Sequence, residues 1–275
     1  MPSALIEQKP GVALPPISTR RIALPTEHGG WGFLLEPLVA GLAIVFSIGG
    51  AWIALMTIGA FLTRQPLKML ILDRMGMRDR RRALAASKYV LLYAAVFAVG
   101  LTGALLTASI TSFVPFLFVL PLVALQNYYD IFRRSRHIVP ELAGAVAISA
   151  SVACITLAGG LALPNALALW AIFVLRLISS ILYVRERLLL EKGKPFSREL
   201  PATAHVLSLV VVVILVSFDL ASVLTLLVMA VLLHRSISGL SPTRTKLKAM
   251  QIGIYEVIYG AVLVASIIAG HFLGV

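Results

Sequence analysis

Nine apolar segments alternate with polar stretches along this chain. They begin near Trp31, Ala51, Tyr89, Ser112, Leu142, Asn165, Ala204, Ala221 and Gln251. Each approaches the roughly 20 residues that a helix needs to cross the hydrocarbon of a bilayer. None shows the short residue-by-residue alternation that is typical of a membrane β-barrel strand. The pattern predicts an all-α fold, a single bundle of nine transmembrane helices over residues 25–275, preceded by a cytoplasmic tail at residues 1–24.

Basic residues gather at alternate connections between these segments. They lie before the first segment and then within 64–88, 133–136, 176–198 and 235–248. The other four connections, at 49–50, 108–111, 159–164 and 218–219, contain no Lys or Arg. Because cytoplasmic loops carry the excess of positive charge, the N-terminus is expected in the cytoplasm and the C-terminus outside the plasma membrane. The inner connections are expected to be the longer ones, at Asp73–Lys88, Tyr128–Val139, Val184–Pro201 and Arg235–Met250.

The composition agrees with a membrane protein. Hydrophobic residues make up 59% of the 275 residues, charged residues only 13%, and the mean hydropathy is +0.96. The formal charge of +12 is explained by topology and by anionic cytoplasmic lipids, so we expect no nucleic-acid partner. The single cysteine, Cys154, excludes an intrachain disulfide and a cluster of thiolate metal ligands.

Five charged residues fall inside the apolar segments rather than at their ends, namely Glu36, Arg64, Lys68, Arg176 and Glu256. A charge at this depth costs several kcal/mol unless it is paired or faces water. All five map to the cytoplasmic half of the predicted bundle. They predict an interior cavity that opens to the cytoplasm, with structural ion pairs as the alternative, for example between Glu36 and either Arg64 or Arg176.

One segment carries a polar stripe. Arg176, Ser180, Tyr183 and Arg187 are spaced by four, three and four residues, which keeps them on one helical face. Guanidinium groups donate forked hydrogen bonds to phosphate or carboxylate, so this face suits an anionic head group. The full set of predicted ligand-binding residues is Trp31, Arg64, Lys68, Arg176, Tyr183, Arg187, His205 and Lys248.

The stretch Thr26-Glu27-His28-Gly29-Gly30-Trp31 opens the first segment. Thr26 is suited to cap the helix, and His28 is suited to proton transfer. Glu27, His28 and Glu256 are therefore the predicted acid–base groups. The alternative is an interfacial cap in which Trp31 anchors the helix at the membrane surface. The histidine spacings match no compact metal motif, so neither a metal nor a cofactor is expected.

These residues resemble a known family. The Glu-His-Gly-x-Trp motif (27–31), Tyr183-Val184-Arg185 with Arg187, His205, and Lys248 followed by Gly-Ile-x-Glu (253–256) look like the YwiC-like integral membrane proteins. The resemblance extends over most of residues 25–265. It identifies Glu27, His28, Trp31, Arg187, His205, Lys248 and Glu256 among the positions that match the family pattern, and it implies no particular reaction.

A more distant resemblance is to the UbiA-type intramembrane prenyltransferases, on Arg64-Gln65-Pro66-Leu67 and on two long basic inner loops. It implies a nine-helix bundle with a site on the cytoplasmic side. That family holds magnesium on a diphosphate with two aspartate-rich motifs, whereas the loop 73–88 offers only Asp73 and Asp79. Any anionic ligand is therefore expected to bind without magnesium.

Together these features predict an integral membrane protein whose cavity binds a membrane lipid or an isoprenoid-like amphiphile with an anionic group. One hypothesis is an intramembrane transferase that lacks the magnesium motifs. The other is a transporter or a lipid-binding accessory protein that uses the same charged cavity. Internal prolines interrupt the first half of the chain and not the last three segments, an asymmetry that favours the enzyme over a transporter built from two matching halves.

Overall fold

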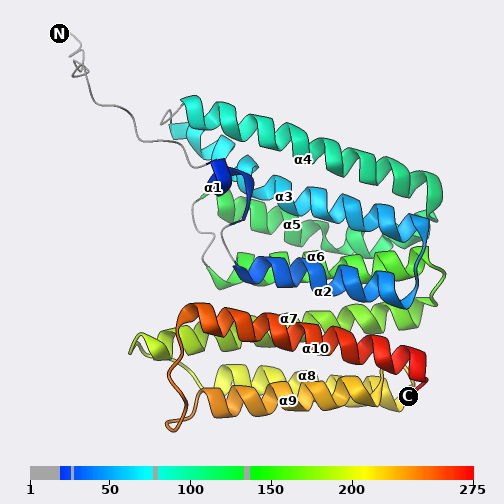
Figure 1. The fold of residues 1–275 in the computed structure, drawn as a ribbon, viewed down its shortest axis with the longest axis vertical. Helices are drawn as coiled ribbons and strands as arrows, with labels where there is room; N and C mark the ends of the chain where they lie inside the picture. The colour runs from blue at the N-terminus through cyan, green and yellow to red at the C-terminus, as the bar shows by residue number, and fades with distance from the viewer. Residues whose placement is uncertain (1–18, 26–27, 77–79, 133–136) are drawn as a thin grey trace.

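The computed structural model describes residues 19–25, 28–76, 80–132 and 137–275, and every regular element in these ranges is helical. Nine of the described helices have 17 residues or more and run alongside one another in alternating directions (Figure 1). They are α2 (His28–Ile44), α3 (Ile48–Gly76), α4 (Arg80–Thr107), α5 (Val114–Ile131), α6 (Ile138–Ala158), α7 (Leu163–Glu191), α8 (Glu199–Ser217), α9 (Val223–Gly239) and α10 (Ala249–Leu273). The short helix α1 (Thr19–Ala23) packs against α3 and α4, and a 3-10 turn, η1 (Ile110–Phe113), precedes α5.

Each predicted apolar segment corresponds to one of these nine helices, so the all-helical prediction is confirmed for the described residues. Two helices extend beyond their apolar stretches at the predicted inner side. Helix α4 begins at Arg80, before the apolar stretch near Tyr89, and α7 continues to Glu191 into the inner connection Val184–Pro201, which agrees with the helical character expected from the sequence at 79–88 and 185–192. The reason is that Ala, Arg, Leu and Glu favour the helix strongly enough to extend it beyond the apolar stretch.

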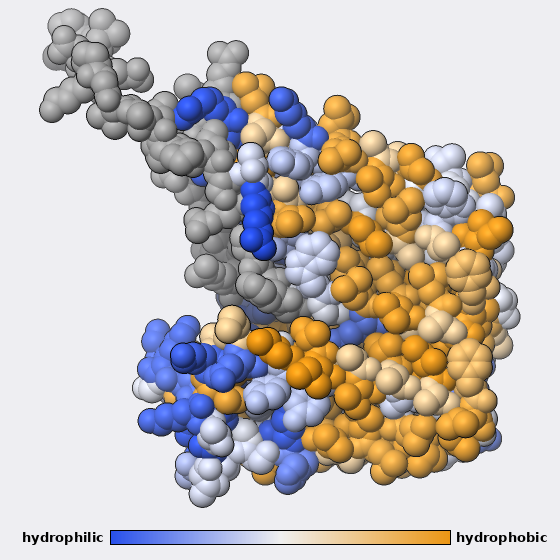
Figure 2. Space-filling view, in the orientation of Figure 1, coloured by the Kyte–Doolittle hydropathy of each residue, from blue (hydrophilic) through white to orange (hydrophobic). Residues whose placement is uncertain are grey.

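Six helical stretches are long and apolar enough to cross a membrane, namely Arg81–Thr107, Ile110–Ile131, Ile138–Ala158, Leu163–Glu191, Glu199–Ser217 and Ala249–Leu273. Two further apolar helices, Gly30–Ile44 and Val223–Gly239, are shorter. Figure 2 shows apolar residues over most of one face of the molecule, with hydrophilic residues gathered at one end of the helices. The chain is therefore a multi-pass integral membrane protein.

Helices α2 and α6 form the centre of the bundle. Helix α6 contacts α2, α3, α5 and α7, while α2 also contacts α10. Small residues allow this central position, because Ala, Ser and Gly let helix backbones approach closely inside a membrane. In α6 the buried small residues are Ala143, Ala145, Ala147, Ser149, Ala150, Ser151, Ala153 and Cys154.

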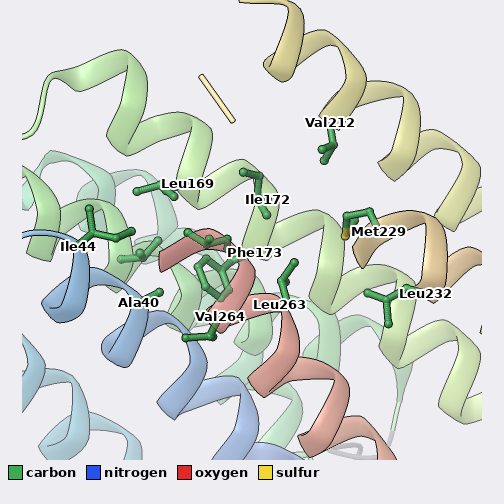
Figure 3. Packing of buried hydrophobic residues seen from close by; sticks show 12 residues of the cluster. Ala40, Ile44, Leu169, Ile172, Phe173, Val212, Met229, Leu232, Leu263 and Val264 are labelled. Atoms are coloured by element: carbon green, nitrogen blue, oxygen red, sulfur yellow. The ribbon is translucent and has the colours of Figure 1, made fainter. Parts of the chain in front are cut away.

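Buried apolar side chains join the central helices to their neighbours. Figure 3 shows the largest cluster, in which Phe173 of α7 lies beside Ala40 of α2 and Leu263 and Val264 of α10. Phe173 and Leu263 are fully buried. A second cluster joins Leu34 and other residues of α2 to α3, α4 and α6. The first cluster packs α2 against α7 and α10, and the second packs it against α3, α4 and α6. The polar residue Glu36 of α2 therefore lies in the interior.

Helices α3 and α4 approach each other closely through glycines. A Cβ atom on Gly100 of α4 would overlap the backbone of Met56 in α3, and one on Gly59 of α3 would overlap the backbone of Phe97 in α4. By contrast, a Cβ on Gly253 of α10 would meet no atom within 4 Å. The contact between α3 and α4 therefore requires glycine, while the position in α10 does not.

We expect Gly100→Ala to lower the unfolding temperature in detergent, because forced separation of packed helices costs roughly 1–3 kcal/mol. The matched variant Gly253→Ala should leave it unchanged or raise it, since alanine favours a helix over glycine by about 1 kcal/mol. The unfolding temperatures of both variants are measured by labelling the fully buried Cys154 with a thiol-reactive fluorophore during heating. An equal effect of the two substitutions would contradict the close packing of α3 and α4.

Candidate functional site

A cavity of about 1030 Å³ lies within the bundle. Its walls come from α2, α3, α4, η1, α5, α6, α7 and α10. Four of the charged residues singled out in the sequence line it, namely Glu36, Arg64, Arg176 and Glu256. The fifth, Lys68, lies one helical turn beyond Arg64 and shares its ion-pair partner. The structure thus brings together charges that are up to 220 residues apart in the sequence.

Aromatic and aliphatic side chains form the long wall of this cavity. Phe61, Phe97, Phe113 and Phe116 contribute rings from α3, α4, η1 and α5. One face of α5 continues the apolar lining through Leu117, Leu120 and Val123. From Phe116 to Asn127 this face extends over roughly 16 Å at the rise of an α-helix. Such a wall suits the apolar chain of an amphiphile.

Cationic and amide groups line the other end of the cavity. The Nε of Arg64 donates to Oδ2 of Asp130 at 2.8 Å, and Nζ of Lys68 lies 3.4 Å from Oδ1 of the same carboxylate. Gln126 and Asn127 line the cavity one turn earlier on α5, and Lys192 lines it from the end of α7. Two cations therefore hold one buried carboxylate, and about a third of the Arg64 side chain remains exposed.

Four buried charges from four helices form a network at the deeper end. The Nη1 of Arg176 on α7 lies 3.5 Å from Oε2 of Glu256 on α10, and its Nη2 donates to the Glu256 backbone carbonyl at 3.1 Å. The same Nη2 lies 3.8 Å from Oε1 of Glu36 on α2. Arg235 of α9 pairs with Oε1 of Glu256. Two guanidinium groups and two carboxylates thus sum to a formal charge of zero.

Glycines make room for this network. A Cβ on Gly260 of α10 would overlap the carboxylate of Glu36, and one on Gly32 of α2 would lie 3.4 Å from its Oε1. The Arg176 guanidinium also contacts Ser180 one turn along α7. Arg176 lines the cavity but has no exposed surface, so its guanidinium lies fully inside the protein.

Three predicted site residues lie outside the cavity wall, on the side of the network toward α8 and α9. The ring of Tyr183 stacks under the guanidinium of Arg235, whose Cζ lies 4.2 Å from the ring centroid. Arg187 pairs with Glu191 at 2.9 Å and donates to the carbonyl of Thr245 at 2.5 Å. His205 is buried, and its Nδ1 lies 2.8 Å from the carbonyl oxygen of Pro201. Tyr183 and Arg187 therefore connect α7 to α9 and to the segment before α10, whereas the hydrogen bond of His205 lies within α8.

Two further predicted residues lie near the ends of helices. Lys248 is exposed at the start of α10, where its backbone N–H donates to Oε1 of Gln251 at 2.9 Å. Trp31 packs edge-on against Phe61, with ring centroids 5.5 Å apart. The predicted acid–base residue Glu27 and the side chain of His28 lie outside the described part of the structure.

Two residues of the site, Asp130 and Arg235, were not among those predicted from the sequence. Both were assigned to inner connections, whereas α5 continues to Ile131 and α9 to Gly239. The ion pair proposed between Glu36 and Arg64 is not the one observed, because Asp130 holds Arg64 and Glu36 faces Arg176. The described residues contain no group of three or more His, Cys, Asp or Glu side chains placed to hold a metal ion.

Comparison with known proteins finds one family model that matches part of the chain. Residues 24–156 match the family model of YwiC-like protein, which confirms the resemblance noted in the sequence for that region. The match includes α2 to α6 and therefore Glu36, Arg64, Lys68 and Asp130, but not Arg176, Arg235 or Glu256. The chain matches no curated protein and no solved structure.

We expect Arg176→Met to lower the free energy of unfolding by about 3–5 kcal/mol, because it leaves a buried carboxylate without its counter-ion. Adding Glu36→Gln should restore part of this loss by removing the uncompensated charge. Arg64→Gln should cost much less, since Lys68 still neutralises Asp130. Thermal unfolding, followed by the exposure of the buried Cys154 thiol, measures the loss of stability in each of the three variants. A double variant that is no more stable than Arg176→Met would contradict the pairing of Arg176 with Glu36.

Proposed function

We propose that this chain, whose residues 24–156 match the YwiC-like family, binds a membrane amphiphile with an acidic head group in its interior cavity. The acidic group lies at the end with Arg64 and Lys68, and the apolar chain follows the wall formed by α4 and α5. The ligand belongs to the lipids or isoprenoid-like compounds.

All nine long helices cross the plasma membrane in this proposal. Helices α2 and α9 are short but apolar, and α3 carries its polar residues Arg64, Lys68 and Asp73 in its second half. The helices alternate in direction, and the basic connections all belong to the end at which α2 begins. The N-terminus is therefore cytoplasmic and the C-terminus external, and the cationic end of the cavity faces the cytoplasm.

One observation carries the proposal, namely the division of a single cavity into an apolar part and a cationic part. A ligand that is apolar throughout would cover the exposed third of the Arg64 side chain and the polar side chain of Gln126 without offering either a hydrogen bond. A fully polar ligand would leave the phenyl rings of Phe97, Phe113 and Phe116 facing it. An amphiphile with an anionic end matches both parts, because guanidinium binds phosphate and carboxylate oxygens through paired donors.

Binding or transport of this ligand is favoured over a transferase reaction that needs magnesium. Glu256 has both carboxylate oxygens in ion pairs, with Arg176 and Arg235, so it is a poor general base. Asp73, one of the two aspartates in the loop 73–88, accepts a hydrogen bond of 2.6 Å from Arg82. A transferase would instead have to rely on Glu27 and His28.

Dodecyl phosphate should bind to the protein in nanodiscs in the presence of excess EDTA. Arg64→Gln should weaken its affinity at least tenfold, since a hydrogen bond to a charged group contributes about 1.5–3 kcal/mol. The control variant Lys194→Gln removes an exposed cation that does not line the cavity and should leave the affinity unchanged. Isothermal titration calorimetry measures these affinities.

Three outcomes would overturn this proposal or part of it. No binding would remove the acidic amphiphile as the ligand, and an equal effect of both substitutions would mean that the phosphate binds at the membrane surface. Binding that appears only after magnesium is added would favour the prenyltransferase hypothesis instead.

A further inference from the structure

Glu36 differs from the other acidic residues of the buried network. Its side chain is almost fully buried in the middle of α2 and lines the cavity. Its Oε1 lies 3.8 Å from Arg176, which is within ion-pair range but too long for a hydrogen bond. Its Oε2 has no hydrogen-bond partner among the described residues. A buried carboxylate oxygen without a donor is costly, so this atom needs a partner that the described protein atoms do not supply.

The neighbouring cations are already engaged elsewhere. Nη1 of Arg176 contacts Ser180 and Glu256, and its Nη2 donates to the backbone carbonyl of Glu256. Arg235 contacts Glu256 and stacks on Tyr183. Buried N–H groups at Nε of Arg176 and at Nε and Nη2 of Arg235 also lack a partner among the described residues. Of the two carboxylates, however, both oxygens of Glu256 are in ion pairs, so Glu36 is the one with an acceptor left over, and it lines the cavity.

The same turn of α2 contains a second acceptor without a helical donor. Pro37 lies inside the helix and has no N–H, so the carbonyl of Phe33 one turn earlier lacks its usual partner. Phe33 also lines the cavity. Two oxygen acceptors thus occur within one turn of α2, in a stretch that is otherwise apolar.

The charge of the network selects the kind of donor. Glu36, Glu256, Arg176 and Arg235 sum to zero, and an ammonium group would add a net positive charge to a region of low dielectric. A hydroxyl group donates a hydrogen bond without changing the charge. A neutral donor therefore fits this position better than a cation does.

We propose that Glu36 forms a second polar subsite, which binds a hydroxyl group on the chain of the amphiphile. The inference rests on the proposed function, because it assigns a further group to the ligand bound at Arg64. Glu36 is 8 residues from the end of α2 at Ile44, and Arg64 is 16 residues from the start of α3 at Ile48. The two helices run in opposite directions from this turn, so the subsites differ in depth by roughly 12 Å at the helical rise. The ligand is then a hydroxylated amphiphile with its acidic group at one end.

A series of hydroxydodecyl phosphates with the hydroxyl at successive chain positions tests this subsite, with dodecyl phosphate as the reference. We expect the compound with its hydroxyl at one position, distant from the phosphate, to bind about tenfold more tightly than dodecyl phosphate. The substitution Glu36→Gln should reduce this gain in affinity to less than threefold. The control Glu141→Gln changes a carboxylate that lines the same cavity near its cationic end, where it pairs with Arg185. It should leave the gain unchanged.

The outcomes separate the subsite from the proposed function. Binding of dodecyl phosphate without a gain at any hydroxyl position, or a gain that survives Glu36→Gln, would overturn the hydroxyl subsite alone. A gain that Glu141→Gln removes equally would place the hydroxyl near the cationic end and also overturn it. No binding by any member of the series would overturn both proposals.

Discussion

The interaction on which this structure depends is the buried network of two arginines and two glutamates. Each charge would be unstable alone in the apolar interior, and the four are tolerable only together. They come from α2, α7, α9 and α10, so the network fixes four helices relative to one another. The glycines at 32 and 260 leave space for the carboxylate of Glu36. The same carboxylate forms part of the cavity wall, which links the stability of the bundle to the chemistry of the site.

Charge is distributed unevenly along the cavity. At the deeper end the charges neutralise one another, whereas at the other end Arg64 and Lys68 hold one carboxylate while Arg64 remains partly exposed. The intervening wall is aromatic and aliphatic. Polar groups therefore occur at two depths, separated by an apolar surface. This arrangement favours recognition of a long ligand by groups at defined distances along its chain.

Much of the fold could be predicted from the sequence, because the length and polarity of each segment are local properties. Nine apolar segments gave nine long helices in the described residues. Hydropathy alone does not give the helix ends, since α4 and α7 extend past their apolar stretches into charged residues that still favour the helix. Helices α5 and α9 likewise continue past their apolar stretches to Ile131 and Gly239, so Asp130 and Arg235 were assigned to loops although both are helical and buried.

The site was predicted only in outline for a physical reason. Charges within apolar segments must converge, so Glu36, Arg64, Arg176 and Glu256 could be identified individually. Their pairing depends on which helices are neighbours, and neither spacing nor composition encodes that. Arg64 pairs with Asp130 of α5 rather than with Glu36 for this reason. The stripe of α7 likewise divides, with Arg176 and Ser180 at the cavity and Tyr183 packed against Arg235.

The central claim is that the cavity holds an acidic amphiphile inside the membrane. Native mass spectrometry of the protein released from its own membrane in mild detergent tests this most directly, with Ala60→Trp as the comparison. Ala60 is exposed and lines the cavity, so an indole there should fill the space without disturbing a packed core. The account predicts a retained amphiphile with an acidic group on the wild-type protein and its loss from the variant. A wild-type protein that carries no such ligand, or a variant that retains the same one, would contradict it.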